Sequence, residues 1–296
     1  MRQDISSKAA FVLVGAVAFS GTATIGQVRA DELPVVAIHN EIGVAAEGQL
    51  LNYKENFSNV PAHDRENGWA PGANLSGQVM FNAYGITHIY AAIDYGIVSG
   101  QSTYTGATID GDYPVQYQHH VAMRDLNLEL GKGFALLDGR LLLTPVLQFG
   151  HHAWDRDLSY SETYHNFYVG GAVHVDYALT QRLVLSGRFG LAETFNAGMD
   201  LSGTSYFAND GTPVPLSNAS FNLGALPVWQ AGVGLDYAIT KRCHLFGKLD
   251  FQRFGYSMGT ATLTGNYNGR SVRLSTIEPN SWTQTLMPMF GAAYAF

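Results

Sequence analysis

The chain has 296 residues, of which 14% are charged and 12% are aromatic, and it contains 33 glycines. Soluble domains carry about 25% charged residues, whereas helical membrane proteins are richer in apolar residues, so the composition fits neither class. The formal net charge of −7 and the lack of a basic patch exclude a typical nucleic-acid binder.

The N-terminus has the pattern of a secretory signal peptide. Arg2 and Lys8 precede an apolar, small-residue stretch at 9–20, and Val28-Arg29-Ala30 has the form of a signal-peptidase site. No later run of about 18 uncharged apolar residues predicts a helical anchor. We therefore expect three parts: a cleaved signal peptide at 1–30, a short periplasmic segment at 31–39, and a β-barrel at 40–296. Removing the signal residues Arg2, Asp4, Lys8 and Arg29 takes away +2 and leaves a net charge of −9.

Ten segments of the remaining chain show the period-two alternation of a strand, in which successive side chains face opposite sides of a sheet. Between Trp229 and Tyr237, for example, apolar residues occupy the odd positions, whereas the even positions hold Gln230, glycines and Asp236. Each segment reaches the roughly 9–11 residues that a tilted strand needs to cross a bilayer. The predicted strands are 40–54, 72–84, 87–99, 117–131, 139–152, 165–179, 182–195, 224–239, 242–256 and 281–296.

One predicted strand has a charge on its apolar face. Leu126 and Leu128 share their parity with Arg124, which would place an arginine toward lipid. A β-bulge near Met123 to Asp125 would turn Arg124 inward and return Met123 to the outer face. We therefore expect a bulge at this point.

The connections between the predicted strands alternate between short and long. The short ones lie near Gly85, at 136–139, at 180–181 and at 240–241, and the long ones are 55–71, 100–116, 153–164, 196–223 and 257–280. Tight turns at one end and long loops at the other are typical of transmembrane β-barrels. The segment Tyr177-Ala178-Leu179-Thr180-Gln181-Arg182 recurs as Tyr237-Ala238-Ile239-Thr240-Lys241-Arg242, which indicates a repeated hairpin turn.

The last predicted strand alternates from Leu286 to the terminal residue Phe296. With Leu143-Thr144-Pro145, Trp154-Asp155-Arg156, Tyr160-Ser161-Glu162-Thr163-Tyr164 and Tyr177-Ala178-Leu179-Thr180, it resembles the bacterial outer-membrane β-barrels of the broad porin-like superfamily. The resemblance implies an all-β, transmembrane, antiparallel up-and-down barrel in the bacterial outer membrane, in contact with lipid and lipopolysaccharide. It also implies recognition of Phe296 by the barrel assembly machinery. It names no substrate.

Charged residues of both signs fall on the predicted lumen face. Inside a narrow barrel such charges pair with one another, because an unpaired buried charge is costly. A conducting path is the alternative, although about eight strands give a lumen that side chains just fill, and ten widen it only modestly. The predicted lumen charges are Glu41, Glu47, Asp94, Glu129, Asp176, Arg188, Asp236, His244, Lys248 and Asp250.

Histidines gather near the loop ends of three consecutive predicted strands, as His119, His120, His151, His152 and His165. Neighbouring strands could bring imidazoles together around a metal. Parity allows only one member of each His-His pair to face inward, and we expect these to be His120 and His152. Without cysteine or carboxylate ligands at fixed spacing, we assign no metal ligand. The single cysteine, Cys243, forms no internal disulfide.

Two kinds of barrel enzyme offer alternatives. The omptin surface proteases, which this strand number also fits, carry paired acids opposite an Asp/His pair at the outer rim. Asp155 and Asp157 supply an acidic pair, but the only near match to the second pair, His174 with Asp176, falls toward the periplasmic end. Lipid-modifying hydrolases need a Ser paired with a His, and no His-Ser or His-x-Ser is present.

The sequence therefore predicts a monomeric, non-enzymatic outer-membrane barrel of about ten strands, with no catalytic or cofactor-binding residues and no cofactor. Eight or twelve strands are the alternatives, and an extra hairpin in 196–223 or 257–280 would give twelve. A lipocalin-like soluble barrel would alternate in the same way but with its apolar face inward. We expect a surface interaction protein or a narrow porin-like conduit, with an omptin-like or lipid-modifying hydrolase as the alternative.

Overall fold

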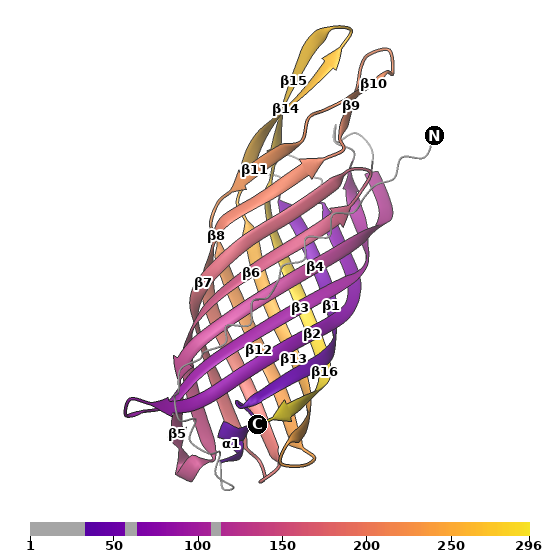
Figure 1. Cartoon of the computed structure of the whole chain (residues 1–296). Helices are drawn as coiled ribbons and strands as arrows, with labels where there is room; N and C mark the ends of the chain where they lie inside the picture. The colour runs from indigo at the N-terminus through magenta and orange to yellow at the C-terminus, as the bar shows by residue number, and fades with distance from the viewer. Residues whose placement is uncertain (1–32, 57–63, 108–113) are drawn as a thin grey trace.

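A computed structural model describes residues 33–56, 64–107 and 114–296. The predicted signal peptide at 1–30 lies outside the described residues. Ten long strands form a closed antiparallel barrel, as the sequence predicted (Figure 1). They are β1 (Glu41–Asn56), β2 (Arg65–Ala83), β3 (Ile86–Ala107), β4 (Pro114–Lys132), β6 (Leu141–Asp157), β7 (Ser161–Ala178), β8 (Leu183–Ser202), β12 (Pro227–Ala238), β13 (Cys243–Tyr256) and β16 (Asn280–Ala295).

The barrel closes between its first and last strands. Strand β1 pairs with β16 from Glu41 opposite Ala295 to Asn56 opposite Asn280. Every other strand pairs with its neighbours along the chain, so the barrel has no unpaired edge. The backbone N–H of Phe296 donates to the carbonyl of Asn40, which ties the C-terminus to the start of β1.

Apolar side chains on the barrel strands point outward, and polar ones point inward. Leu147 is 73% exposed and Phe290 is 65% exposed, whereas Gln148 and Asp176 are each 1% exposed. This distribution is that of a transmembrane barrel and excludes the lipocalin-like alternative. Exposed apolar residues occur on all ten strands: Ile42, Val44, Leu75, Ile93, Ile97, Leu128, Leu130, Leu147, Val169, Val173, Phe189, Leu191, Val233, Leu235, Leu249 and Phe290.

The prediction of a bulge in β4 is wrong. The pairing of β3 with β4 runs without a shift through Ile97 opposite Arg124, so Arg124 stays on the outer face and Met123 is buried inside. The guanidinium of Arg124 is instead paired with the carboxylate of Asp155 on the adjacent β6, at 2.6 Å. A cross-strand ion pair makes the outward arginine tolerable without a change in register.

One end of the barrel, here called the loop end, is taller than the sequence predicted. Because β6 and β7 continue into the predicted loop at 153–164, only Leu158–Tyr160 remains as a turn. The predicted loops at 196–223 and 257–280 do contain strands, which are β9 (Ser205–Phe207), β10 (Pro213–Pro215), β11 (Ala219–Leu223), β14 (Gly259–Tyr267) and β15 (Arg270–Glu278). Strand β11 pairs with the loop-side end of β8, whereas the other four form two hairpins that project beyond the barrel, so the number of barrel strands stays at ten (Figure 1).

The opposite end, here called the turn end, holds the C-terminus and a short helix, α1 (Pro34–Ala37). Val35 and Val36 of α1 are buried in an apolar cluster with Leu142, Ala178 and Val184 of the surrounding strands. Strand β5 (Phe134–Leu136) and a 3-10 turn, η1 (Leu137–Gly139), connect β4 to β6 at this end. Among the described residues, no helix has the length and apolar character needed to cross a membrane.

The two repeated sequence segments form the same turn. The hydroxyl of Thr180 accepts hydrogen bonds from the backbone N–H groups of Arg182 and Leu183, at 3.1 and 3.0 Å. The hydroxyl of Thr240 accepts equivalent bonds from Arg242 and Cys243, at 3.2 and 3.0 Å. A threonine at this position therefore replaces the missing backbone partners of the turn.

We expect Thr180→Ala and Thr240→Ala each to lower the free energy of unfolding by about 1 kcal/mol, because each removes the acceptor of two exposed turn amides. Urea unfolding of the refolded protein, followed by tryptophan fluorescence, measures the change. Serine at the same positions keeps the hydroxyl and should retain most of the stability. If the Ala and Ser variants lost the same free energy of unfolding, the stabilisation would come from the threonine methyl group and not from the hydroxyl.

Candidate functional site in the barrel lumen

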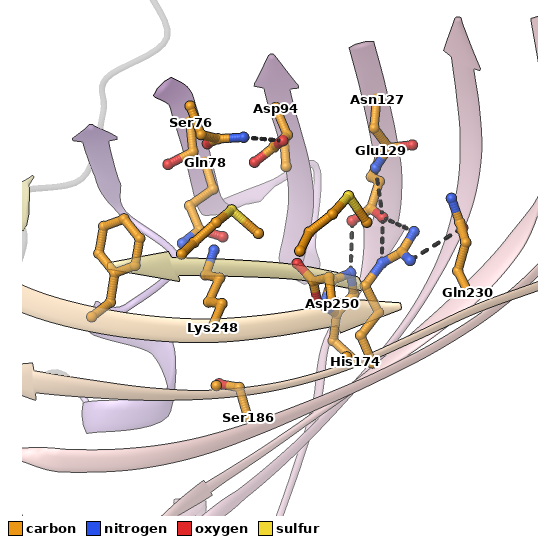
Figure 2. A pocket seen from close by; sticks show the side chains of 18 of the residues that line it. Ser76, Gln78, Asp94, Asn127, Glu129, His174, Ser186, Gln230, Lys248 and Asp250 are labelled. Carbon is orange, nitrogen blue, oxygen red and sulfur yellow. Dashed lines mark hydrogen bonds and ion pairs between the residues drawn. The ribbon is translucent and has the colours of Figure 1, made fainter. Parts of the chain in front are cut away.

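The inward side chains enclose a cavity of about 210 Å³ inside the barrel, part of which is shown in Figure 2. Its lining contains nine of the ten charged residues that the sequence placed on the lumen face. The tenth, His244, lies beside Glu41 and Asp236. The predicted lumen face is therefore confirmed. The nine lining residues are Glu41, Glu47, Asp94, Glu129, Asp176, Arg188, Asp236, Lys248 and Asp250.

Glu129 is the centre of the largest network in this cavity. Its carboxylate accepts two hydrogen bonds from Arg188, at 3.1 and 2.8 Å, and one from His174 at 2.6 Å. Arg188 also donates to Gln148 at 2.6 Å and to Gln230 at 3.1 Å. Figure 2 shows Glu129, His174 and Gln230, which come from different strands, on the same side of the lumen. In this network the guanidinium of Arg188 bonds to a carboxylate and to two neutral amides. A fully bonded network of this kind holds the strands that contribute to it rigidly together.

Lys248 faces the same cavity in a looser arrangement. Its ammonium lies 5.1 Å from the centre of the Phe246 ring, and no carboxylate of the described chain comes within 4.0 Å of it. Asp94 accepts a hydrogen bond from Asn74 at 2.8 Å, and Asp250 also lines this side of the cavity. One cation and two acids thus face open space, where they can contact a small polar guest.

Glycines on the lumen face provide the room for these carboxylates. A side chain at Gly232 would overlap the carboxylate of Asp250, and one at Gly96 would lie 2.7 Å from the carboxylate of Glu47. Because glycine has no Cβ, the backbone of one strand lets a longer side chain lie against it. Part of the high glycine content therefore reflects the packing of the lumen.

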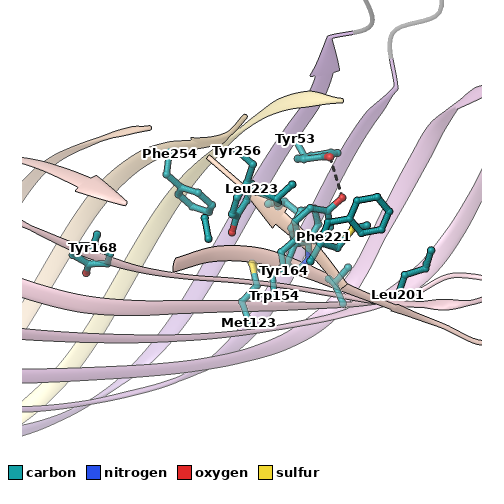
Figure 3. Packing of buried hydrophobic residues seen from close by; sticks show 14 of the residues in the cluster. Tyr53, Met123, Trp154, Tyr164, Tyr168, Leu201, Phe221, Leu223, Phe254 and Tyr256 are labelled. Atoms are coloured by element: carbon teal, nitrogen blue, oxygen red, sulfur yellow. Dashed lines mark hydrogen bonds between the residues drawn. The ribbon is translucent and has the colours of Figure 1, made fainter. Parts of the chain in front are cut away.

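An aromatic layer closes the lumen on the loop side of the cavity (Figure 3). Tyr53, Trp154, Tyr164 and Tyr256 are each at most 1% exposed. Trp154 stacks on Tyr164 with ring centres 5.4 Å apart, and Tyr164 lies 5.3 Å from Tyr256. Every barrel strand except β16 contributes to this apolar cluster, so the layer spans the lumen.

A buried cluster of charges lies against the aromatic layer. Arg156 is 2% exposed and pairs with Glu66 at 2.6 Å and with Glu162 at 2.5 Å. Its guanidinium also lies 5.1 Å from the centre of the Tyr53 ring and 5.0 Å from that of Trp154. Arginine therefore joins the acids of the loop end to the aromatic layer beneath them.

The sequence did not point to this cluster, although a signal was present. The alternation in β6 continues past His152, which places Trp154 and Arg156 on the inner face, but the predicted strand ended at 152. Asp155-Arg156-Asp157 looked like a solvated loop because charged residues surround the inward arginine. Extending the parity by four residues would have found it.

Glu278, at the end of β15, accepts hydrogen bonds from Tyr164 at 2.7 Å and from Tyr53 at 3.4 Å. Burial raises the pKa of its carboxyl well above the usual range, and the neighbouring Glu55 and Glu162 raise it further. Folding therefore takes up a proton here. Stability from this group is complete below its ordinary pKa and is lost as the pH rises through the raised one.

We expect Glu278→Gln, which cannot ionise, to be as stable as the native chain near pH 4 and increasingly more stable than it as the pH rises to about 8. Denaturant unfolding across this range measures the difference. Asp157→Asn, at an exposed acid near the same end, is the matched control and should leave the profile unchanged. Parallel profiles for the native chain and Glu278→Gln would contradict the expectation.

The turn end of the lumen is closed by residues 33–40. His39 donates from Nε2 to the carboxylate of Asp176 at 2.9 Å, and Gln78 donates to the carbonyl of Ile38 at 2.6 Å. Burial opposes a charged imidazole, but the Asp176 carboxylate outweighs burial and raises the pKa of His39. The segment is therefore fixed to the lumen wall by both apolar packing and an ion pair.

The clustered histidines do not share a site. His119, not His120, faces inward and lies 3.0 Å from Glu66, whereas His120 faces outward and bonds to Ser99, so the prediction for His120 is wrong. His152 does face inward, where it bonds to Asp125 at 2.6 Å.

The remaining two histidines of that group lie outside the lumen. His151 packs against the ring of Phe167, and His165 lies 4.0 Å from Asp200. The inward pair is also widely separated, because Asp125, the partner of His152, is six residues from His119 along β4, about 20 Å in a strand. Among the described residues, none of these five histidines belongs to a cluster of three potential metal ligands.

The residues considered for an omptin-like site are also apart. Asp155 faces outward and pairs with Arg124, and Asp157 is exposed at the loop end. His174 and Asp176 lie inside the barrel near the turn end, bonded to Glu129 and His39. The two pairs thus lie at opposite ends of the barrel and cannot act on one substrate.

No protein-family model and no curated protein matches this sequence. Among solved structures, the outer membrane protease OmpT from Escherichia coli aligns over 87% of this chain and 97% of its own, with a TM-score of 0.51 and 9% identity. The translocator domain of the autotransporter NalP from Neisseria meningitidis aligns with a TM-score of 0.34 and 14% identity, over 87% and 90% of the two chains.

Ail, the attachment invasion locus protein of Yersinia pestis, aligns over 87% of this chain and 99% of its own, with a TM-score of 0.29 and 9% identity. At these identities the likeness concerns the fold and carries no activity. The likeness to OmpT, with the closed ten-stranded barrel and its outward apolar face, shows that the chain has the fold of the outer-membrane β-barrels.

Proposed function

We propose that this chain is a monomeric protein of the bacterial outer membrane that acts, without catalysis, as a surface interaction protein through its loop end. The outward apolar face supports contact with outer-membrane lipid, and lipopolysaccharide would surround the loop end. The predicted signal peptide and terminal Phe296 support export and insertion by the barrel assembly machinery. A barrel inserted with its loop end at the cell surface would have its turn end facing the periplasm.

The closed lumen is the observation that carries this proposal. The aromatic layer around Trp154 blocks the loop side of the cavity, and the segment around Val35 blocks the turn side. Trp154 and Val35 are each 0% exposed, which supports a lumen without a continuous path for solutes. A porin-like conduit would require both to move.

The projecting hairpins supply the binding surface. Strands β9–β10 and β14–β15 are linked by an isolated bridge between Leu216 and Gly265, and Tyr267 donates to Asp210 at 2.7 Å. Ser217 and Thr264 exchange two further hydrogen bonds, at 2.7 and 3.0 Å. A pre-ordered extension loses less conformational entropy on binding than separate mobile loops would.

Single-channel recording in a planar bilayer tests the closed lumen. The refolded, heat-modifiable protein should produce no discrete conductance steps. Reproducible steps that change in Lys248→Gln would overturn the proposal in favour of the narrow conduit, because Lys248 lines the cavity and no carboxylate of the described residues lies within 4.0 Å of its ammonium. An omptin-like hydrolase has only the shared fold in its support, since the acid and histidine pairs do not meet.

Photo-crosslinking on whole cells tests the binding surface. A photoreactive residue at Asn268, in the tip between β14 and β15, should capture a defined partner, whereas one at Gln181, in a turn at the other end, should not. A second photoreactive residue can be placed at the tip between β9 and β10. Removing residues 262–275 shortens the β14–β15 hairpin and should abolish the contact that this second residue captures. Equal capture at both ends of the barrel would contradict a specific role for the loop end.

A further inference from the structure

Three potential metal ligands meet inside the barrel at the turn end. Glu41 begins β1, Asp236 lies near the end of β12, and His244 lies at the start of β13. Nδ1 of His244 lies 3.2 Å from Oε2 of Glu41 and 3.0 Å from Oδ1 of Asp236. One ligand atom from each residue falls within 4.8 Å of the other two, and all three residues are less than a tenth exposed.

This cluster is incompletely satisfied by the protein itself. Nδ1 of His244 can carry only one hydrogen, yet it faces two carboxylates and makes a well-aligned hydrogen bond to neither. Oε2 of Glu41 and Oδ2 of Asp236 also lack a hydrogen-bond partner within the described chain. Two buried carboxylates that share one imidazole leave negative charge uncompensated, which is costly.

We propose that Glu41, Asp236 and His244 bind a divalent transition-metal ion. Separations of 3.0 and 3.2 Å between Nδ1 and the two carboxylate oxygens suit ligands around one ion at about 2.0–2.2 Å. The ion would neutralise both carboxylates while Nδ1 of a neutral imidazole coordinates it. An imidazole among the ligands favours zinc or a similar ion over magnesium or calcium.

The neighbouring groups hold one ligand in position. Gln78 donates to Oε1 of Glu41 at 3.1 Å, which leaves Oε2 directed to the site, and the same amide donates to Ile38 beside α1. Outer hydrogen bonds of this kind orient metal ligands. Because β16 separates β1 from β13 in the barrel, the ion would link strands on both sides of the closing seam.

Isothermal titration of the metal-stripped, refolded protein with Zn²⁺ tests this site. The native chain should bind one ion that His244→Gln loses or binds at least tenfold more weakly, with Asp236→Asn as a second, independent lesion. The matched control is His152→Gln, because His152 is also a buried lumen histidine beside a carboxylate, Asp125. Heat-modifiability on gels confirms that each variant is folded before titration.

Either of two results would overturn the site. One is the absence of saturable binding to the folded native chain, which would mean that His244 serves as a cation between the two carboxylates. The other is Zn²⁺ binding of equal stoichiometry and affinity in native chain, His244→Gln and Asp236→Asn, which would place the ion on exposed histidines such as His120. Neither result bears on the proposed surface role, which the conductance and crosslinking experiments test separately.

Discussion

Replacing Arg156 with methionine is expected to lower the free energy of unfolding by about 3–5 kcal/mol. The substitution keeps much of the side-chain length but removes the cation that pairs with Glu66 and Glu162. Glu66 is 0% exposed, so without the guanidinium its carboxyl group must either bear an uncompensated buried charge or take up a proton, and both are unfavourable. The aromatic rings of Tyr53 and Trp154 would also lose their cationic neighbour.

Arg124→Met is the matched control, because Arg124 also makes a 2.6 Å ion pair with an acid but at a site that is 44% exposed on the arginine side. Exposed pairs contribute about 0–1 kcal/mol, so this variant should stay close to the native chain. Equilibrium urea unfolding in lipid vesicles compares the two. If both variants lose a similarly small free energy of unfolding, water or a rearrangement must stabilise the acids near Arg156 in its absence. That result would contradict the role of Arg156 as a buried counter-ion.

The sequence predicted the strands better than their lengths, for a physical reason. Within the apolar belt one strand face meets lipid and the other meets the lumen, so alternation is sharp, as between Trp229 and Tyr237. Toward the loop end the polarity of the two faces is inverted. In β8, Met199 and Leu201 point into the aromatic layer while Asp200 is exposed, so this end does not continue the pattern of the belt and was read as a loop.

The charged residues of the lumen were predictable, but their partners were not. Parity alone places Glu129 and Arg188 inside, yet it says nothing about which strand lies opposite or at what height. The pairs His39 with Asp176 and Glu66 with Arg156 join residues far apart in sequence. Strand tilt and stagger around the closed barrel determine such contacts, and a single strand pattern does not encode them.

The outer face illustrates the same limit. A lone arginine among leucines suggested a bulge, because the sequence does not show that Asp155 of the next strand lies beside Arg124. The repeated turns were easier, since Thr180 and Thr240 bond to backbone groups only two and three residues away. The positions of the local turns were therefore predicted, and the side-chain contacts between strands were not.

Opening the lumen at both ends is expected to convert a silent barrel into a conducting one. Tyr53→Ala with Trp154→Ala removes two rings of the aromatic layer, whose centres are 5.1 Å apart, and deletion of residues 33–38 removes α1 from the turn end. Either lesion alone leaves the other closure intact, so neither should conduct. The combination connects the polar cavity to both sides, and single-channel recording should show discrete steps.

The outward pair Phe149 and Phe167, with ring centres 5.8 Å apart, supplies the matched control for the loop-end lesion. Phe149→Ala with Phe167→Ala removes two rings from the lipid-facing side and should leave the barrel silent, with or without the deletion at 33–38. Each buried aromatic truncation costs about 3–5 kcal/mol, so only heat-modifiable, folded preparations are recorded. Silence of the folded combined variant would show that the lumen has a further barrier beyond the aromatic layer and α1. Current from the outward control would instead assign conduction to a general loosening of the barrel wall.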